Sequence, residues 1–538
     1  MNVTVTPPHL LIVPIILPLL TGALMLFFDD RERRLKLTMS LLSVFGLLGV
    51  ALMLLDRVHS GEEALAMVYL VGNWPAPVAI NLVADRLSAV MLALTAALAL
   101  PAILFAMERW ERAGPHFHSL FQFLLVGING SFLTGDLFNL FVFFEVMLAA
   151  SYGLVLHGGG ALRVRSGMHY ITVNLGASLI FLVGIAMVFG ATGTLNLAEI
   201  AVRAEMLEGF ARPALDVGLA MLALAFLIKA GMWPLCHWLV PAYAAAAGPV
   251  AAVFAMLSKV GIYSLLRLSL LLPGDGAAFG AILIFIGGAA TLGFACVGVL
   301  ASQSMKRASA YFILMSSGTL LSTFGISLQG GTAGALFYLL SSTLAVSGLF
   351  MLVELLEREQ DITAGVLGVT QEAYGEDDFE EETEVGSVMP GAVAILGGAF
   401  GLLAIILIGL PPLSGFLAKF AILTAILGPG AEDLGSTGNM RGTLVVLLLV
   451  SGLVSMIALS RMGIRTFWAP IEPFTPKVTI VETAPILLLL AMLIALAAYA
   501  GPVMELLQAT ADDLHHPGRY LSAVLDAERV PPYAESEQ

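Results

Sequence analysis

The chain has 538 residues, of which 59% are hydrophobic and only 12% are charged. Soluble domains carry about 25% charged residues, so the composition excludes an ordinary soluble domain and predicts an all-α polytopic membrane protein. The net charge of −14 comes largely from an acidic run near residue 380 and from the C-terminal tail, and the lack of a basic patch argues against nucleic-acid binding.

Apolar stretches long enough to cross a bilayer occur fourteen times along the chain. The first is expected to be a span and not a removed signal, because it lacks a basic start and a small-residue cleavage site. Only Gly135 and Asp136 separate the fourth from the fifth, which predicts a tight hairpin, and the twelfth is too long for one straight helix. The stretches cover approximately residues 9–28, 35–55, 85–107, 117–134, 137–157, 168–190, 216–240, 249–272, 278–300, 308–328, 333–356, 388–428, 441–462 and 479–500.

Basic residues gather in the connections that follow odd-numbered spans. Such connections share one side of the membrane, and the excess of Lys and Arg assigns that side to the cytoplasm. An even number of spans then places both termini outside the cytoplasm. The basic residues concerned are Arg31, Arg33, Arg34, Lys36, Arg109, Arg112, Arg163, Arg165, Lys306, Arg307, Arg461 and Arg465.

Three segments outside the spans carry structural signals. Residues 65–84 predict two short strands around a Trp-Pro turn on the outer face, and residues 194–212 have the helical spacing of an interfacial helix. Residues 358–387 are expected to form a cytoplasmic loop that contains the acidic run 372–384. That run is interpreted either as a solvated loop or as a segment that attracts cations or docks a partner.

The stretch Leu222–Tyr243 combines a charge with a predicted helix break. Lys229 lies within an apolar run and is followed by Gly231 and Pro234. A charged residue at membrane depth costs roughly 2.5–3.5 kcal/mol on insertion scales, and a proline removes a backbone donor. A charge beside a broken helix indicates a transport site, whereas a lysine that snorkels from an ordinary kinked helix is the structural alternative.

Three further charges lie inside predicted spans: Glu145, Lys259 and Lys419. A buried carboxylate and a buried amine placed close together stabilise each other's charged forms, and a proton that moves nearby tips the balance. We therefore hypothesise that Glu145 and Lys229 form a pair in a proton relay. A structural role for Glu145, bonded to a serine or to the backbone, is the alternative, and the same alternative applies to Lys259.

The segment around Pro412 is similar to the segment around Pro234. WPLCHWL and PPLSGFL both contain Pro-Leu, two residues and then aromatic-Leu, and Lys419 follows the second. The similarity predicts an internal repeat with two broken helices in corresponding positions.

The remaining polar residues of the spans give weaker signals. His237 is expected either to join the relay or to form a structural hydrogen bond. Asp85 and Asp136 precede spans, so helix capping is the preferred interpretation for both. Cys236 and Cys296 lie in apolar segments, which is typical of small core residues. The sequence predicts neither a metal site nor a cofactor.

Long stretches of the chain resemble a known family. KAGMWPLCHWLVPAY with PVAAVFAMLSKVGIYSLLR resembles the antiporter-like subunits of respiratory complex I, membrane-bound hydrogenases and Mrp-type multisubunit cation/proton antiporters. DLFNLFVFFEVMLAASYGL and GNWPAPVAINLVADRLSA are most similar to the D subunit of the Mrp type, and the acidic tract resembles its potassium-linked form. The resemblance covers almost the entire chain.

The resemblance implies a fourteen-helix fold with two inverted five-helix repeats, each with a broken helix. The chain is then expected to divide into residues 1–116, 117–272, 273–470 and 471–538, where the second and third parts are the repeats. The family's key positions fall on Glu145, Lys229, Lys259 and Lys419. The implied role is proton translocation coupled to export of Na⁺ or K⁺ across a bacterial inner membrane, in a complex with A, B, C, E, F and G subunits.

The chain departs from the family pattern in its second half. Many relatives carry His or Lys in the eleventh span, where this chain offers Ser341, Ser342 and Thr343, and Phe312 replaces a histidine of the tenth. The link between Lys259 and Lys419 is therefore expected to depend on water and hydroxyl groups.

Three functions compete at this point. The first is a proton-conducting subunit of a cation/proton antiporter, a transporter part and not an enzyme. The second is a proton-pumping membrane subunit of a complex I-like or hydrogenase-type redox complex. The third is a scaffold whose buried charges are structural.

Overall fold

The structure is a computed structural model. It describes the backbone of residues 9–29, 31–60, 66–75, 80–272, 277–374, 391–428, 435–468 and 478–527. The side chains of residues 277–279, 358–374 and 435–437 lie outside the description.

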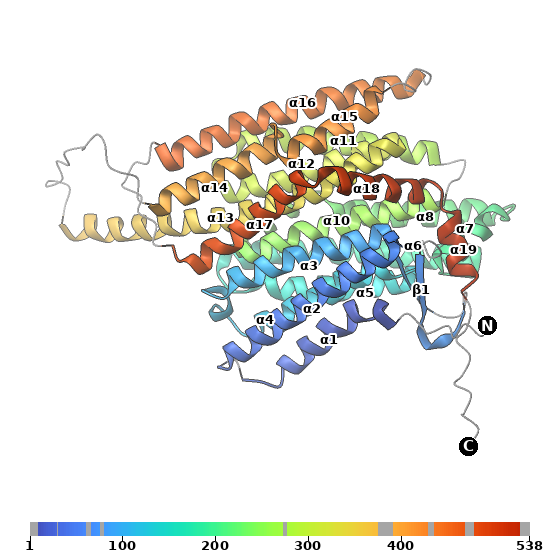
Figure 1. The fold of residues 1–538 in the computed structure, drawn as a ribbon, viewed down its shortest axis with the longest axis horizontal. Coiled ribbons are helices and arrows are strands. Elements are labelled where there is room, and N and C mark those ends of the chain that lie inside the picture. Colours follow the sequence, from blue (N-terminus) through green and yellow to red (C-terminus); the bar gives the residue numbers. More distant parts are fainter. Residues whose placement is uncertain are drawn as a thin grey trace.

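The described chain is a bundle of long helices that run in roughly one direction (Figure 1). Short 3-10 segments, η1 (His9–Leu11), η2 (Val71–Asn73) and η3 (Trp110–Arg112), and a π-helical turn, Ile464–Trp468, accompany them. The α-helices are α1 (Val13–Met25), α2 (Arg33–Ser60), α3 (Arg86–Ala106), α4 (Phe117–Leu133), α5 (Leu137–Leu156), α6 (Ala161–Thr192), α7 (Leu197–Glu205), α8 (Ala211–Ala230), α9 (Leu239–Ala245), α10 (Gly248–Leu271), α11 (Ala277–Ala301), α12 (Met305–Ile326), α13 (Gln329–Tyr374), α14 (Gly391–Ile408), α15 (Ser414–Leu427), α16 (Gly435–Gly463), α17 (Ile480–Ala498), α18 (Ala500–His515) and α19 (Gly518–Leu525).

Each of the fourteen predicted spans contains at least one of these helices. Within the described residues, twelve helices are long and apolar enough to cross a membrane, and α1, α4 and α15 are shorter apolar helices. The seventh span is broken into α8 and α9, and the twelfth into α14 and α15. The predicted fold class, an all-α polytopic membrane protein with two broken helices, is confirmed.

Burial separates the centre of the bundle from its lipid-facing rim. The most apolar 18-residue window is entirely buried in α10 and 94% buried in α12 and α13, but only 33% buried in α2 and α17. Because α10 also packs against α3, α8, α12 and α13, it forms the axis of the bundle. A charged group on α10 is therefore surrounded by protein.

Carboxylates begin two of the spans, as the capping interpretation predicts. Asp85 accepts a hydrogen bond from the backbone N–H of Ser88 at 2.9 Å at the start of α3. Asp136 accepts one from the N–H of Asn139 at 2.8 Å at the start of α5. Each satisfies a backbone donor that a helix start leaves unpaired.

One end of the bundle carries the predicted hairpin. β1 (Ala66–Leu70) pairs antiparallel with β2 (Asn81–Asp85), so that Ala66 lies opposite Asp85. The helix predicted for residues 194–212 corresponds to α7, which covers only Leu197–Glu205. Gly209 has a φ of +62°, and α8 begins just beyond it, so residues 206–210 form a turn and not a continuation of the helix.

The long helix α13 extends well beyond its apolar part. Its backbone stays helical to Tyr374, so the first half of the predicted loop 358–387 is helix and not loop. Residues 375–390 lie outside the described residues, as do the side chains of the acidic run 372–384.

The C-terminal helices run along the bundle to the end that carries the hairpin (Figure 1). α18 packs against α13, α10 and α3, and α19 contacts the hairpin and α7 (Figure 1). Because η1 also contacts both strands, the first and last described segments lie at the same end of the bundle.

Candidate functional site

The break in the seventh span begins where α8 ends at Ala230. Gly231 takes a φ of +76°, and the N–H groups of Gly231 and Met232 donate to carbonyls of the last turn. This is the hydrogen-bonding pattern of a glycine-terminated helix. The indole Nε1 of Trp238 donates to the carbonyl of Ile228 at 3.2 Å, and Pro234 lies in the non-helical segment. The free end of α8 is therefore satisfied inside the protein, as irregular backbone at membrane depth requires.

Lys229 lies on the last turn of α8, and its side chain is buried. Its Nζ lies 3.3 Å from the hydroxyl oxygen of Ser178 on α6, and that hydroxyl donates to Oε1 of Glu145 on α5. The same Nζ lies 5.1 Å from the centre of the Phe144 ring. Ser178 thus connects the two predicted partners, and Glu145, Ser178 and Lys229 form the first cluster.

Lys259 lies in the middle of α10 with 1% of its side chain exposed. Its Nζ donates to the hydroxyl of Ser316 on α12 at 2.9 Å, and that hydroxyl lies 2.8 Å from the hydroxyl of Ser342 on α13. Lys259, Ser316 and Ser342 form the central cluster, which crosses from the bundle axis into the second half of the chain.

The second break separates α14 from α15 and contains Pro412. Gly409 has a φ of +84°, and the Nζ of Lys419 donates to the carbonyl of Ile408 at 2.9 Å. The lysine therefore satisfies a carbonyl that the end of α14 leaves unpaired. The hydroxyl of Ser341 on α13 donates to the hydroxyl of Ser414, the first residue of α15, at 2.9 Å.

Two buried hydroxyl groups beside these clusters have no hydrogen-bond partner among the described residues. They belong to Ser317, next to Ser316, and to Thr343, next to Ser342. Buried polar groups are normally paired with protein or with ordered water, so both positions suit water molecules.

His237 lies apart from the first cluster and the central cluster. Its side chain is exposed, and its ring packs edge-on against Phe294 with 6.2 Å between ring centres. The described residues therefore place it against another aromatic ring and not between Glu145 and Lys229.

The sequence did not single out Ser178, Ser316 or Ser414. A serine in an apolar helix is a weak signal, because its hydroxyl commonly bonds to a carbonyl of its own helix, as Ser309 does with Met305 at 2.9 Å. The signal available in the sequence was that a buried lysine needs a hydrogen-bond partner, which a serine on a neighbouring helix can supply.

Two carboxylates outside the membrane-spanning helices, Asp136 and Asp85, have pKa values that are shifted in opposite directions. Burial raises the pKa of Asp136, although the N–H groups of Asn139 and Phe138 oppose this shift. Burial also acts to raise the pKa of Asp85, but the guanidinium of Arg267 and the hydrogen bonds from Ser88 together outweigh it, and the pKa is lowered. Among the described residues no group of three or more His, Cys, Asp or Glu side chains could hold a metal ion, and Cys236 and Cys296 are buried free thiols.

Two interrupted helices, each with a buried lysine beside the interruption, define the class of the protein as an ion-translocating membrane subunit. The chain belongs to the family described as NADH:quinone oxidoreductase/Mrp antiporter, TM, whose family model matches residues 134–444.

The relatives cover nearly the whole chain. It is 52% identical over 530 residues to the D subunit of a probable K(+)/H(+) antiporter of Rhizobium meliloti, with 97% of this chain and 98% of the relative covered. It is 32% identical to the D subunit of the Na(+)/H(+) antiporter of Alkalihalophilus pseudofirmus, with 96% and 99% covered. A chain of the Mrp complex from Dietzia sp. has the same fold, with a TM-score of 0.82, 25% identity and 96% and 100% coverage.

Proposed function

We propose that this multi-pass membrane protein is the proton-translocating D subunit of a multisubunit monovalent cation/proton antiporter. The observation that carries the proposal is the hydroxyl bridge between a partly buried carboxylate and a buried amine in the first cluster. A serine hydroxyl accepts one hydrogen bond while it donates another, so it can pass a proton from Lys229 to Glu145. The full-length similarity to antiporter D subunits supports the same role.

The proposed path continues through the bundle axis. Protons reach Lys229 from Lys259, which exchanges them with Ser316 and Ser342 and, by way of ordered water, Ser341 and Ser414, with Lys419. The two halves of this path correspond to the proposed repeats 117–272 and 273–470, each of which contains one broken helix.

Potassium is the proposed cation. The relative named for K(+)/H(+) is 52% identical to this chain, whereas the first relative named for Na(+)/H(+) is 32% identical. The protein would act in a bacterial inner membrane together with A, B, C, E, F and G subunits. The basic connections support a cytoplasmic position for the end opposite the hairpin, with both termini outside the cytoplasm.

Antiport by the complete complex in everted membrane vesicles tests the proposal. We expect Glu145→Ala and Lys229→Ala to abolish K⁺-dependent proton movement while the complex still assembles, because each removes one end of the bridge. Glu205→Ala is the matched control, since Glu205 is an exposed carboxylate of α7. Full transport in either test variant would refute the proposed path, and co-purified redox subunits would favour the redox-complex alternative.

A further inference from the structure

A buried ion pair closes the end of the bundle that carries the hairpin. Near the end of α10, Arg267 binds both carboxylate oxygens of Asp85, with Nη2 2.8 Å from Oδ1. The same Nη2 donates to the hydroxyl of Tyr263 at 3.1 Å. The guanidinium also lies 5.4 Å from the ring centre of Tyr263 and 5.1 Å from that of Tyr520 on α19. Only 10% of the side chain of either Asp85 or Arg267 is exposed.

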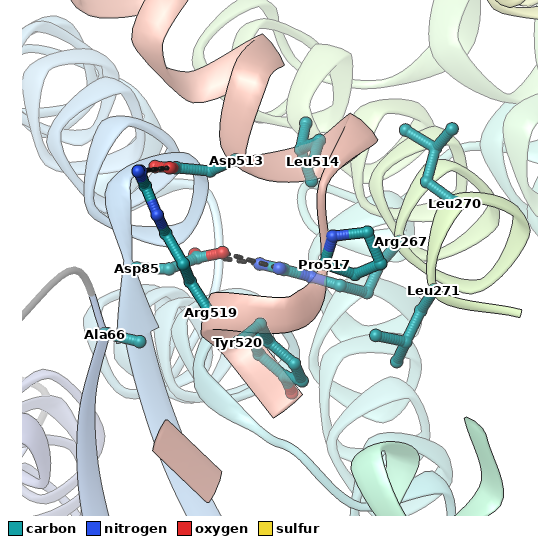
Figure 2. A pocket seen from close by; sticks show the side chains of 10 residues that line it. All are labelled: Ala66, Asp85, Arg267, Leu270, Leu271, Asp513, Leu514, Pro517, Arg519 and Tyr520. Atoms are coloured by element: carbon teal, nitrogen blue, oxygen red, sulfur yellow. Dashed lines mark hydrogen bonds and ion pairs between the residues drawn. The ribbon is translucent and has the colours of Figure 1, made fainter. Parts of the chain in front are cut away.

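Arg267 lines two small cavities. The outer cavity has a volume of ≈ 20 Å³ and is bordered by the ends of α10, α18 and α19, and Figure 2 shows the ion pair and Tyr520 at its edge. The inner one offers ≈ 10 Å³. A cavity needs a volume of about 10–15 Å³ to hold one water molecule, so each of the two has room for roughly one. The residues that line the inner cavity include Phe226, Tyr263, Ser264 and Arg267.

The inner cavity lies close to the first cluster. Phe226 lines the cavity, and its ring stacks on Phe144 with 5.9 Å between ring centres. Phe144 in turn contacts the Nζ of Lys229. Two stacked rings therefore connect the lining of the inner cavity with the lysine, and Arg267 of the ion pair borders both cavities.

We propose that Asp85 and Arg267 form a gate on the hairpin side of the first cluster, and that Tyr520 is the cover of this gate. The proposal rests on the proposed function, because it names where that proton path meets water. In the proposed closed state, the bidentate pair and the two neighbouring rings of Tyr263 and Tyr520 keep the two cavities from forming a continuous water chain. Displacement of Tyr520 frees the guanidinium on one face and joins the cavities.

Charged contacts hold the cover in place. Asp513 of α18 pairs with Arg86, which directly follows Asp85, and also with Arg519, which precedes Tyr520, at 3.3 Å. The C-terminal helices are thus attached by charge to the start of α3. Their movement is therefore coupled to the gate.

Accessibility of an introduced thiol measures the gate directly. Ser264 lines the inner cavity, so we place Ser264→Cys in a chain with Cys236→Ala and Cys296→Ala, which removes both native thiols. The complete complex in right-side-out vesicles is exposed to Ag⁺ in nitrate buffer. Thiols that remain free are then counted with a fluorescent maleimide after denaturation.

We expect Tyr520→Ala to raise the rate of Ag⁺ modification about tenfold, since the desolvated contact between cation and ring is lost. Tyr520→Leu is the second variant for the case that Tyr520→Ala assembles poorly. Tyr520→Phe keeps the ring and should leave the rate unchanged. Leu521→Ala is the matched control, because Leu521 packs on the core from the same helix α19.

Equal modification rates in all variants would overturn the gate, because Tyr520 would then not control access to the inner cavity. A rise in Leu521→Ala as large as in Tyr520→Ala would also overturn it, because the effect would then come from the packing of α19 in general. A rise seen only in everted vesicles supports the gate and refutes the proposed orientation. The measurement requires no transport, so a failure of the proposed function is detected separately, as a loss of antiport dependence on Glu145 and Lys229.

Discussion

Replacement of Ser178 by alanine should disconnect the first cluster. The hydroxyl donates to the Glu145 carboxylate and accepts from the Lys229 Nζ at 3.3 Å. Hydrogen bonds to charged groups contribute about 1.5–3 kcal/mol, and a 3.3 Å contact is longer than usual, so it belongs at or below the low end. A loss of about 2 kcal/mol for the bridge is therefore reasonable. At about 1.4 kcal/mol per factor of ten, this loss corresponds to roughly 30-fold in the population of the connected arrangement.

The measurement is the initial rate of K⁺-dependent proton movement in everted vesicles that contain the complete complex. Ser178→Ala should lower this rate roughly 30-fold, in line with the loss of the connected arrangement. Ser178→Thr retains a hydroxyl and should keep most of the rate. Ser309→Ala is the matched control, because Ser309 is equally buried but bonds only to the carbonyl of Met305 in its own helix.

A wild-type rate in Ser178→Ala, with the complex assembled, would refute the hydroxyl bridge. An equal loss in Ser309→Ala would show that removal of any buried hydroxyl from the bundle damages transport. The proposed proton transfer between Lys229 and Glu145 would then need another route.

Three further predictions concern other parts of the molecule. Ser342→Ala leaves the Ser316 hydroxyl without its partner on α13 and should lower antiport about tenfold in the same vesicle assay, at unchanged assembly. Gly409→Ala should lower the thermal midpoint and the transport rate, because Gly409 has a φ of +84° and an added Cβ would lie 2.8 Å from a side-chain carbon of Lys419. Gly401→Ala should change neither, because an added Cβ there has open space around it. Asp85→Asn should cost about 3–5 kcal/mol from pH 8 down to pH 5, because it breaks a buried pair. The pKa of Asp85 is lowered in the folded state, so the pair stabilises above the unfolded value of about 3.9, and the difference in thermal midpoint should shrink only below that pH.

The spans were predictable because the bilayer imposes a simple length requirement. About 20 apolar residues are needed to cross it, and the fourteen predicted stretches match the helices that the chain forms. Prolines and glycines at Gly231, Pro234 and Pro412 indicated the two breaks, since few residue types interrupt a helix at membrane depth. Polar segments were predicted less well. A loop was expected from residue 358 onward because the apolar residues end there, but the end of an apolar run does not by itself end a helix, and α13 continues to Tyr374.

The buried charges were predictable from the sequence, but their hydrogen-bond partners were not, because these partners lie far away along the chain. Buried lysines could be identified individually from their cost in hydrocarbon. Their hydroxyl partners lie 51 residues away for Lys229 and 57 for Lys259, and no local pattern connects such positions. Asp85 illustrates the same limit: capping of α3 is a local property and was predicted, whereas its pair with Arg267 spans 182 residues and was not.

The central part of the proposed path contains a discontinuity that the side chains explain. Ser342 bonds toward α12 and its neighbour Ser341 bonds toward α15, because successive residues of a helix point about 100° apart. The two hydroxyl pairs therefore lie on different faces of α13 and are not bonded to each other. A hydroxyl also carries no net charge, so a proton cannot rest there as it can on an amine. The proposed transfer between Lys259 and Lys419 then crosses α13 in one passage through ordered water. With serines and no titratable side chain at Ser341 and Ser342, the proposed path holds its charge on the two lysines and depends on hydration of α13 between them.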